Sequence, residues 1–135
     1  MTHETVAKAP CKTCPYRRDV PSGVWAAHEY DRLPAFDGEP VEQFVKGGTF
    51  LFGCHQNDGH LCAGWVATHG AQNLVALRLR AERIDPSVWS YTSPVPVFSS
   101  GQEACDHGKQ DIENPSDAAV RAVTRLSRKV RLRRR

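Results

Sequence analysis

The stretch Cys11-Lys12-Thr13-Cys14-Pro15-Tyr16-Arg17 places two cysteines three positions apart in a segment typical of a tight turn. A C-x2-C turn holds two sulfurs on one side of the loop, where backbone N–H groups stabilise the thiolates that a soft metal binds. A second pair follows 39 residues later, with seven residues between its members. Four thiolates complete a tetrahedral shell, so the spacing predicts one metal or cluster site whose ligands are Cys11, Cys14, Cys54 and Cys62.

The second pair leaves the ligand set open. The segment Asn57-Asp58-Gly59 is typical of a turn, which would return Cys54 and Cys62 to the same point. His55 directly follows Cys54, and neighbours on an extended strand face opposite ways. Only one of these two side chains easily reaches a shared ion, so His55 is the alternative ligand to Cys54. Three metal-free interpretations compete: free buried thiols, a disulfide pair and a thiol redox couple.

The identity of the bound group is less sharply indicated. Zn²⁺ suits a four-cysteine structural site in a small domain, where ligation stabilises the fold directly. A [4Fe–4S] cluster also takes four thiolates, and the Cys14-Pro15 step occurs in ferredoxin-type motifs. We favour zinc slightly and keep the cluster as the alternative cofactor.

Residues beside the cysteines are expected to support the site. Four thiolates around one zinc ion leave two net negative charges, which Arg17 would offset. Gln56 follows the Cys54-His55 step, and Trp65 follows Cys62 after two small residues. The small residues allow close backbone approach, and the indole would exclude water or serve as ordinary core.

Charge is distributed unevenly along the 135 residues. The chain has 18 Lys and Arg against 15 Asp and Glu, but residues 121–135 hold eight of the bases and no acid. This excess predicts salt-sensitive contact with nucleic acid or with an acidic protein. The expected contact residues are Arg121, Arg125, Arg128, Lys129, Arg131, Arg133, Arg134 and Arg135.

Periodicity and turn residues predict a small, irregular α+β domain stapled by the four-cysteine site and followed by a basic helix. We divide the chain into a flexible lead-in (1–10), a cysteine core (11–90), an irregular connection (91–114) and a basic amphipathic helix with its tail (115–135). In the first half we expect a helix over 23–33, capped by Ser22 and ended by Pro34, a helical turn at 41–46 and a buried strand at 49–52. Helices are then expected over 62–69 and 71–83, and a brief helix over 86–89. A strand is the competing interpretation of residues 71–83.

The terminal helix has the clearest signals. Asn114 is the expected cap and Pro115 the first helical residue. Ala119, Val123, Leu126 and Val130 recur at helical spacing, which predicts the buried face of this helix.

Several classes of protein are disfavoured. No apolar run is long enough to span a membrane, and Met1–Thr5 lacks the pattern of a signal peptide, so a cytoplasmic protein is expected. No nucleophile elbow, phosphate loop or H-E-x-x-H motif occurs. Enzymatic activity is therefore uncertain and not favoured, no catalytic residue is assigned, and no small-molecule substrate is inferred. Cys105 and His107 are a second, poorer metal candidate, either with His28, His60 or His69 or as a source of a fourth ligand; a lone Cys-x-His in a loop is more often incidental.

The blocks Cys14-Pro15-Tyr16-Arg17, Cys54-His55 and Cys62-Ala63-Gly64-Trp65 resemble an uncharacterised family of small proteins from actinomycetes and their bacteriophages. Its members share C-P-[W/Y]-R, C-H and C-A-G-W blocks in this order, and the resemblance covers roughly residues 8–90. It implies that the four cysteines, His55, Arg17 and Trp65 belong to one site. We expect a metal-binding interaction protein, with an iron–sulfur redox or sensor protein and a metal-free thiol redox enzyme as alternatives.

Overall fold

The computed structural model describes residues 3–54, 56 and 59–134, with side chains up to Arg128. Its helices and strands follow in the order β1 (Thr5–Val6), α1 (Ala27–Asp31), α2 (Pro40–Lys46), β2 (His60–Leu61), α3 (Ala63–His69), α4 (Val75–Arg78), α5 (Gly101–Lys109) and α6 (Asp117–Arg134). Short 3-10 helices add η1 (Leu33–Phe36), η2 (Ala71–Asn73), η3 (Ala81–Arg83) and η4 (Pro86–Ser90). Helices and a two-stranded sheet in one small domain agree with the expected α+β class.

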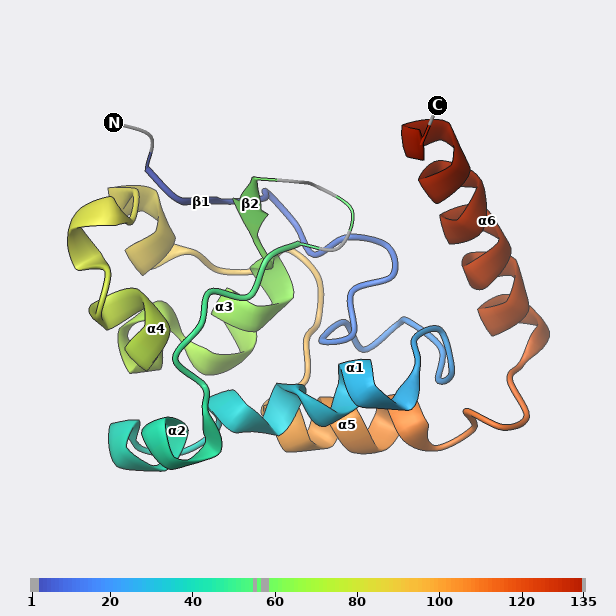
Figure 1. Ribbon diagram of the computed structural model, residues 1–135, viewed down its shortest axis with the longest axis horizontal. Coiled ribbons are helices and arrows are strands. Elements are labelled where there is room, and N and C mark those ends of the chain that lie inside the picture. Colours follow the sequence, from blue (N-terminus) through green and yellow to red (C-terminus); the bar gives the residue numbers. More distant parts are fainter. Residues whose placement is uncertain (1–2, 55, 57–58, 135) are drawn as a thin grey trace.

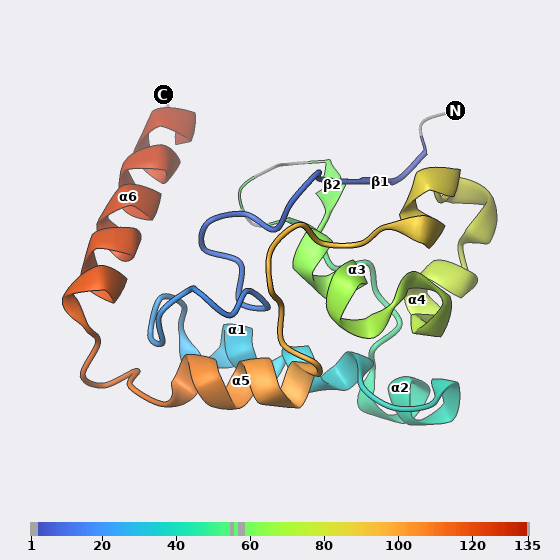
Figure 2. The same cartoon turned by 180° about the vertical axis from the view of Figure 1, so that it is seen from behind.

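The elements surround the segment that carries the first cysteine pair. Figure 1 shows α5 lying alongside α1 and η1, with α3 and α4 above them and α6 standing at one end of the molecule. The view from behind (Figure 2) shows α2 and α4 at the opposite end from α6. β1 pairs in parallel with β2, Thr5 beside His60 and Val6 beside Leu61, which ties the N-terminus to the segment before α3. In the described residues no helix is both long and apolar enough to cross a membrane.

The core is an aromatic cluster that adjoins the cysteines. Phe36 lies edge-on to Trp65 with ring centroids 5.3 Å apart, and Tyr16 lies edge-on to Phe52 at 5.9 Å. Cys14 and Cys62 belong to the same buried cluster. Edge-to-face aromatic pairs add to the stability from burial, so this side of the cysteine region is closely packed.

The helix expected at 62–69 is present as α3, and the sequence signals explain its limits. Cys62 is the N-cap residue, and its Sγ accepts a hydrogen bond from Trp65 N over 3.4 Å. Gly70 ends the helix with a φ of 80°, a conformation that favours glycine. The turn expected at 41–46 is also present, as α2.

The prediction that residues 91–114 are an irregular connection is wrong for its central part. Ser100 accepts a hydrogen bond from Glu103 N and caps the nine-residue helix α5. Gly101 and Gly108 allow close packing of this helix: a Cβ at Gly108 would overlap the Tyr30 ring, and one at Gly101 would overlap the Leu33 carbonyl. The glycines mark a tight helix contact, which sequence alone does not distinguish from a loop.

Two elements expected in the first half also differ. In place of a helix over 23–33, α1 spans only Ala27–Asp31 and η1 follows it, with Pro34 inside η1. Ser22 is not the cap; its hydroxyl donates to Gly108 O and accepts from Asp111 N, so it joins the chain to the end of α5. Residues 49–52 form no strand, although Phe52 is buried as expected.

The helix expected over 71–83 is divided into η2, α4 and η3, and the competing strand does not form either. Leu74 separates η2 from α4 in an extended conformation and, with Leu77, is fully buried, so tertiary burial overrides the continuous helical pattern. The brief helix expected from Pro86 to Trp89 is present as η4.

The basic helix α6 begins two residues later than expected. Ser116 Oγ accepts from Ala119 N and serves as the cap in place of Asn114. Ala119 and Ala122 are buried, and they pack with half-buried Leu126 against Val20 and Val24. Val123, expected on the buried face, is 41% exposed because that face follows positions 119, 122 and 126. The side chain of Val130 lies outside the described residues.

Candidate functional site

The four cysteines selected from the sequence lie together. Cys14 Sγ and Cys62 Sγ are 3.7 Å apart, and both side chains are buried. The thiol of Cys11 interacts with those of Cys14 and Cys54, so the four side chains form a connected series from Cys54 through Cys11 and Cys14 to Cys62. All five cysteines of the chain are in the free thiol form. Within the described residues, no group of three or more Cys, His, Asp or Glu side chains is arranged so that it could hold a metal ion.

Two loops bring the pairs together. The first is a turn in which Cys14 N donates to Cys11 O over 2.9 Å and Arg17 N donates to Cys14 O over 3.1 Å. In the second, Cys54 N donates to His60 O and Cys62 N donates to Phe52 O, so backbone hydrogen bonds close the loop between the cysteines. The expected return of the chain between residues 54 and 62 is therefore confirmed, while His55, Asn57 and Asp58 lie outside the described residues.

Crowding of the thiols alters their acidity. The pKa of Cys11 is raised, chiefly by its hydrogen bond with Cys14 and by burial, while its hydrogen bond with Cys54 has the opposite effect. The pKa of Cys14 lies well above its usual range: the hydrogen bond with Cys11 lowers it, but the one with Cys62 and burial outweigh that effect. Without a nearby cation, this arrangement favours neutral thiols.

Gly64 fits between the two cysteine pairs as the sequence predicts. A Cβ at this position would lie 2.5 Å from Cys14 Sγ and 2.8 Å from Tyr16 Cβ. The first turn of α3 therefore approaches the C-x2-C turn more closely than any larger residue permits. This approach sets the separation between Cys14 and Cys62.

Thr13 connects the first turn to two distant segments, a role not predicted from the sequence. Its hydroxyl accepts a hydrogen bond from Gln56 Nε2 over 2.5 Å, and its carbonyl accepts from Trp25 Nε1 over 2.8 Å. Gln56 links the loop after Cys54 to the C-x2-C turn through this hydrogen bond. Trp25 carries no sequence signal for this role because it lies outside the cysteine motifs.

Arg17 and Trp65 lie beside the site, with different functions. The Arg17 guanidinium pairs with Asp19 at 2.6 Å and donates to Pro10 O at 2.9 Å. The pKa of Arg17 is raised mainly by its hydrogen bond with Asp19, and charge on Cys14 and Cys11 adds to the effect. Trp65 is fully buried in the aromatic core, and its indole N–H has no acceptor among the described residues.

Cys105 and His107 lie apart from this cluster. Cys105 is on α5, with its Sγ 4.0 Å from Asp31 Oδ1, while His107 Nε2 lies 2.7 Å from Val20 O. The two side chains have separate partners.

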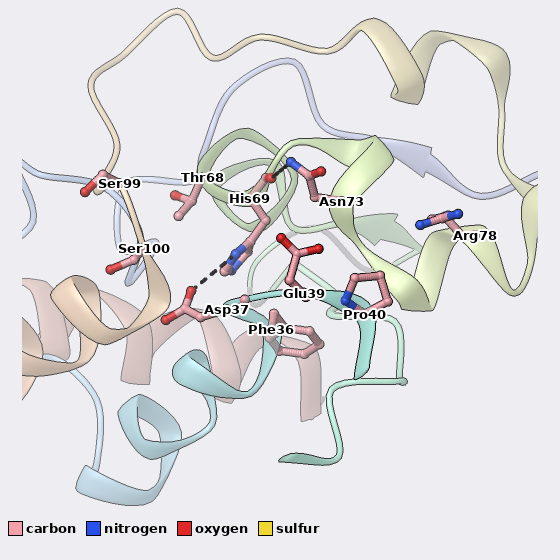
Figure 3. Close-up of a pocket in the computed structure, with 11 residues that line it drawn as sticks. Phe36, Asp37, Glu39, Pro40, Thr68, His69, Asn73, Arg78, Ser99 and Ser100 are labelled. Atoms are coloured by element: carbon pink, nitrogen blue, oxygen red, sulfur yellow. Dashed lines mark hydrogen bonds and ion pairs between the residues drawn. The ribbon is translucent and has the colours of Figure 1, made fainter. Parts of the chain in front are cut away.

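A separate polar pocket of about 490 Å³ lies between η1, α2, the end of α3 and the start of α5 (Figure 3). His69 Nδ1 faces Asp37 Oδ1 at 3.4 Å, and on its other side Nε2 lies 3.3 Å from the Tyr16 hydroxyl. Burial lowers the pKa of His69 to about 4, although the Asp37 charge acts in the opposite direction. The sequence did not indicate this pair because its members are 32 positions apart.

Asp37 also anchors α5 from this pocket. Its two carboxylate oxygens accept hydrogen bonds from Gly101 N at 2.7 Å and Gln102 N at 2.8 Å. A carboxylate at a helix N-terminus satisfies unpaired N–H groups and complements the helix dipole. Asp37 therefore already has an established structural role.

The predicted basic surface is described for its first half. Arg121, Arg125 and Arg128 are exposed on α6, as expected for contact residues. The backbone of α6 continues to Arg134, but the side chains of Lys129, Arg131, Arg133 and Arg134, and the whole of Arg135, lie outside the described residues.

Fold and site together define a small α+β domain organised around two cysteine pairs. The model of a family of unknown function, DUF6283, matches residues 6–129, so the chain belongs to this family. No curated protein and no solved structure matches the chain. The expectation of an uncharacterised family is confirmed, and the match extends beyond residues 8–90 into α6.

Proposed function

We propose that this protein binds one metal ion, preferably Zn²⁺, through Cys11, Cys14, Cys54 and Cys62, and that it acts as an interaction protein contacting nucleic acid through its basic C-terminal region. The observation that carries the metal proposal is the separation of 3.7 Å between Cys14 Sγ and Cys62 Sγ. Tetrahedral zinc with bonds of ~2.3 Å sets its sulfurs roughly 3.8 Å apart. The pair therefore already has the spacing of two ligands on one ion.

The same separation favours a single ion over a [4Fe–4S] cluster. In a four-iron cluster each cysteine binds a different iron, so the thiolates stand at separate corners and farther apart. Sulfurs that share one ion lie in contact, as Cys14 and Cys62 do. The cluster remains the alternative for a redox or sensor protein.

The chemistry around the cysteines supports ligation. Crowded, buried thiolates would repel one another, and a cation that replaces the thiol protons removes this repulsion and stabilises the deprotonated cysteines. Arg17, held in place by Asp19, is the arginine expected beside the four thiolates, although its ion pair with Asp19 already offsets most of its charge. Closing the shell requires Cys11 and Cys54 to adjust toward the other pair.

A four-cysteine site fully occupies the ion, which indicates a structural centre and not a catalytic one. We further propose that the C-P-[W/Y]-R, C-H and C-A-G-W blocks are the family's common signature, and that actinomycetes and their bacteriophages are its source. Described residues of two blocks adjoin here: Cys14 and Cys62 are adjacent, and Gly64 packs on Cys14. His55 remains the alternative fourth ligand.

The competing thiol redox function rests on the same pair, because thiols 3.7 Å apart are near the distance at which a disulfide forms. Metal analysis and an absorption spectrum of protein purified without oxygen distinguish the proposals. One zinc per chain without a visible band supports the structural site. About four iron atoms per chain, with an absorption band at roughly 400 nm, indicate the cluster. Absence of metal from every preparation, with loss of two titratable thiols on oxidation, contradicts the metal proposal and supports the thiol couple.

A further inference from the structure

The basic helix α6 does not stand alone; it forms one wall of a groove whose other wall is the C-x2-C turn. A groove of about 330 Å³ is lined by Lys12, Arg17 and Asp19 on one side and by Arg121 and Arg125 of α6 on the other. A neighbouring groove of about 230 Å³ joins Lys12, Thr13 and Gln56 to Arg125 and Leu126. Lys12 and Arg125 line both. In Figure 1 the N-terminal segment accordingly runs beside α6.

Packing fixes the two walls relative to each other. Ala119 and Ala122 are buried against Val20 and Val24. Trp25 packs on the same small cluster and also on the main core, while its indole N–H donates to Thr13 O in the C-x2-C turn. The indole thus joins the base of α6 to the segment that carries Lys12. The relative position of the two walls, and hence the groove, is therefore fixed by the packing of the fold.

The charges in the groove are unbalanced. Asp19 is paired with Arg17 at 2.6 Å, so this acid and this base offset each other. Lys12, Arg121 and Arg125 are exposed and form no ion pair with any residue in the described part of the chain. Three uncompensated cations face a shared space, which is an arrangement that attracts an anion.

The cations continue beyond the groove in a regular row. Arg121, Arg125 and Arg128 occupy positions i, i+4 and i+7, so they lie along one side of α6 at intervals of about 6 Å or less. Beyond this row the sequence adds four more bases, Lys129, Arg131, Arg133 and Arg134, before residue 135. A row that extends past the groove fits a polyanion with repeating phosphates better than a small anion that would fill the groove alone.

A membrane surface is the weaker partner for this helix. Binding in the plane of a bilayer needs a free apolar face. The apolar face formed by Ala119, Ala122 and Leu126 is already packed on the domain, and the apolar side chains that α6 exposes in its described part, Val120 (51%) and Val123 (41%), make a narrow strip beside the charged side.

We propose that the groove between the C-x2-C turn and α6 binds the phosphate backbone of nucleic acid. Lys12 contacts phosphates from one wall of the groove, and Arg121 and Arg125 contact them from the other. Arg128 contacts a further phosphate beyond the groove. This inference rests on the proposed function and deepens it: the contact surface includes Lys12, which lies inside the cysteine motif, and excludes Arg17, whose guanidinium is already satisfied. The backbone-directed contacts predict affinity with little dependence on base sequence.

The test measures binding of fluorescein-labelled double-stranded DNA by anisotropy over a series of salt concentrations. The variants are Lys12→Gln and Arg125→Gln, and the matched control is Arg78→Gln, which removes an exposed charge from α4 at the other end of the molecule. Each groove variant should weaken binding about threefold or more near 100 mM salt and reduce the salt slope by about one, as expected for one lost phosphate contact. The control should bind like the unmodified chain.

The outcomes separate the two proposals. If the unmodified chain binds DNA but Lys12→Gln behaves like Arg78→Gln, the groove is wrong while contact through the C-terminal region stands. If the unmodified chain binds neither DNA nor RNA, both the groove and the nucleic-acid part of the proposed function are wrong. Binding of poly-glutamate in the absence of DNA binding assigns the surface to an acidic protein and overturns the inference. Metal content, measured on the same samples, reports separately on the cysteine site.

Discussion

Gly64 and Cys14 come so close that a single added methyl group at position 64 would lie 2.5 Å from the Cys14 sulfur. This contact connects the C-A-G-W block to the C-x2-C turn directly. It also makes the spacing of the cysteine pairs dependent on one backbone position.

Replacement Gly64→Ala tests that dependence. Alanine ordinarily stabilises a helix by up to about 1 kcal/mol relative to glycine. Here overpacking against Cys14 and Tyr16 should reverse the sign and destabilise the protein by about 1–3 kcal/mol. Chemical denaturation gives the free energy of unfolding, and Gly53→Ala is the matched control because its nearest neighbour would be His60 O at 4.0 Å. A Gly64→Ala protein at least as stable as the unmodified chain would contradict the close approach.

Replacement Cys14→Ser tests whether the cluster is a structural metal site. Loss of one buried ligand should eliminate bound zinc and lower the Tm by about 10 °C or more, because metal-binding energy contributes to folding. The control is Cys105→Ala, since Cys105 is buried on α5 beside Asp31 and away from the other thiols. Its metal content should remain unchanged. Equal metal content and Tm in Cys14→Ser and the unmodified chain would exclude Cys14 as a ligand.

His69 predicts an acid-dependent loss of stability. Its pKa is about 4 in the folded protein, against about 6.5 for a free imidazole, because the ring is buried. The unfolded chain therefore binds a proton first as the pH falls. Stability is complete above about pH 6.5 and decreases toward pH 4, by about 3 kcal/mol for the full difference.

The measurement compares the unmodified chain with His69→Gln, which replaces the titrating ring with a polar amide that does not titrate. Denaturation of both proteins is followed from pH 7 to pH 4 in the same buffer and metal-loading state. The stability difference between them should shrink as the pH falls, because only the unmodified chain loses the histidine contribution. Parallel pH profiles would show that His69 is not held neutral by burial.

The packing of α5 supplies a prediction outside the cysteine region. A Cβ at Gly108 would overlap the Tyr30 ring, so Gly108→Ala should destabilise the protein by about 1–3 kcal/mol. Asp106→Ala, on the exposed side of the same helix, should change stability by less than about 0.5 kcal/mol. Thermal unfolding followed by circular dichroism distinguishes them. Similar Tm values for the two variants would refute a tight contact between α5 and α1.

Local signals explain which elements could be predicted. The cap at Cys62 and the stop at Gly70 lie within the sequence of α3, so its limits follow from neighbouring residues. The signals failed where distant packing decides. Glycine is unfavourable inside a helix, and the reason for Gly108 is visible only in the structure, where Tyr30 packs against it. The helical pattern over 71–83 is interrupted because Leu74 and Leu77 are buried.

Residue types and short spacings are local properties, so two cysteine pairs, a glycine that permits close approach and a basic C-terminal region could be recognised without a structure. Which of these groups meet depends on packing between distant segments. Hydrogen bonds from Trp25 and Gln56 hold Thr13 in the C-x2-C turn, and α6 packs beside this turn. Lys12 and Arg125 therefore line the same groove, although they are more than a hundred residues apart in the sequence. Such juxtapositions arise from burial of apolar surface between distant segments, which no local pattern records.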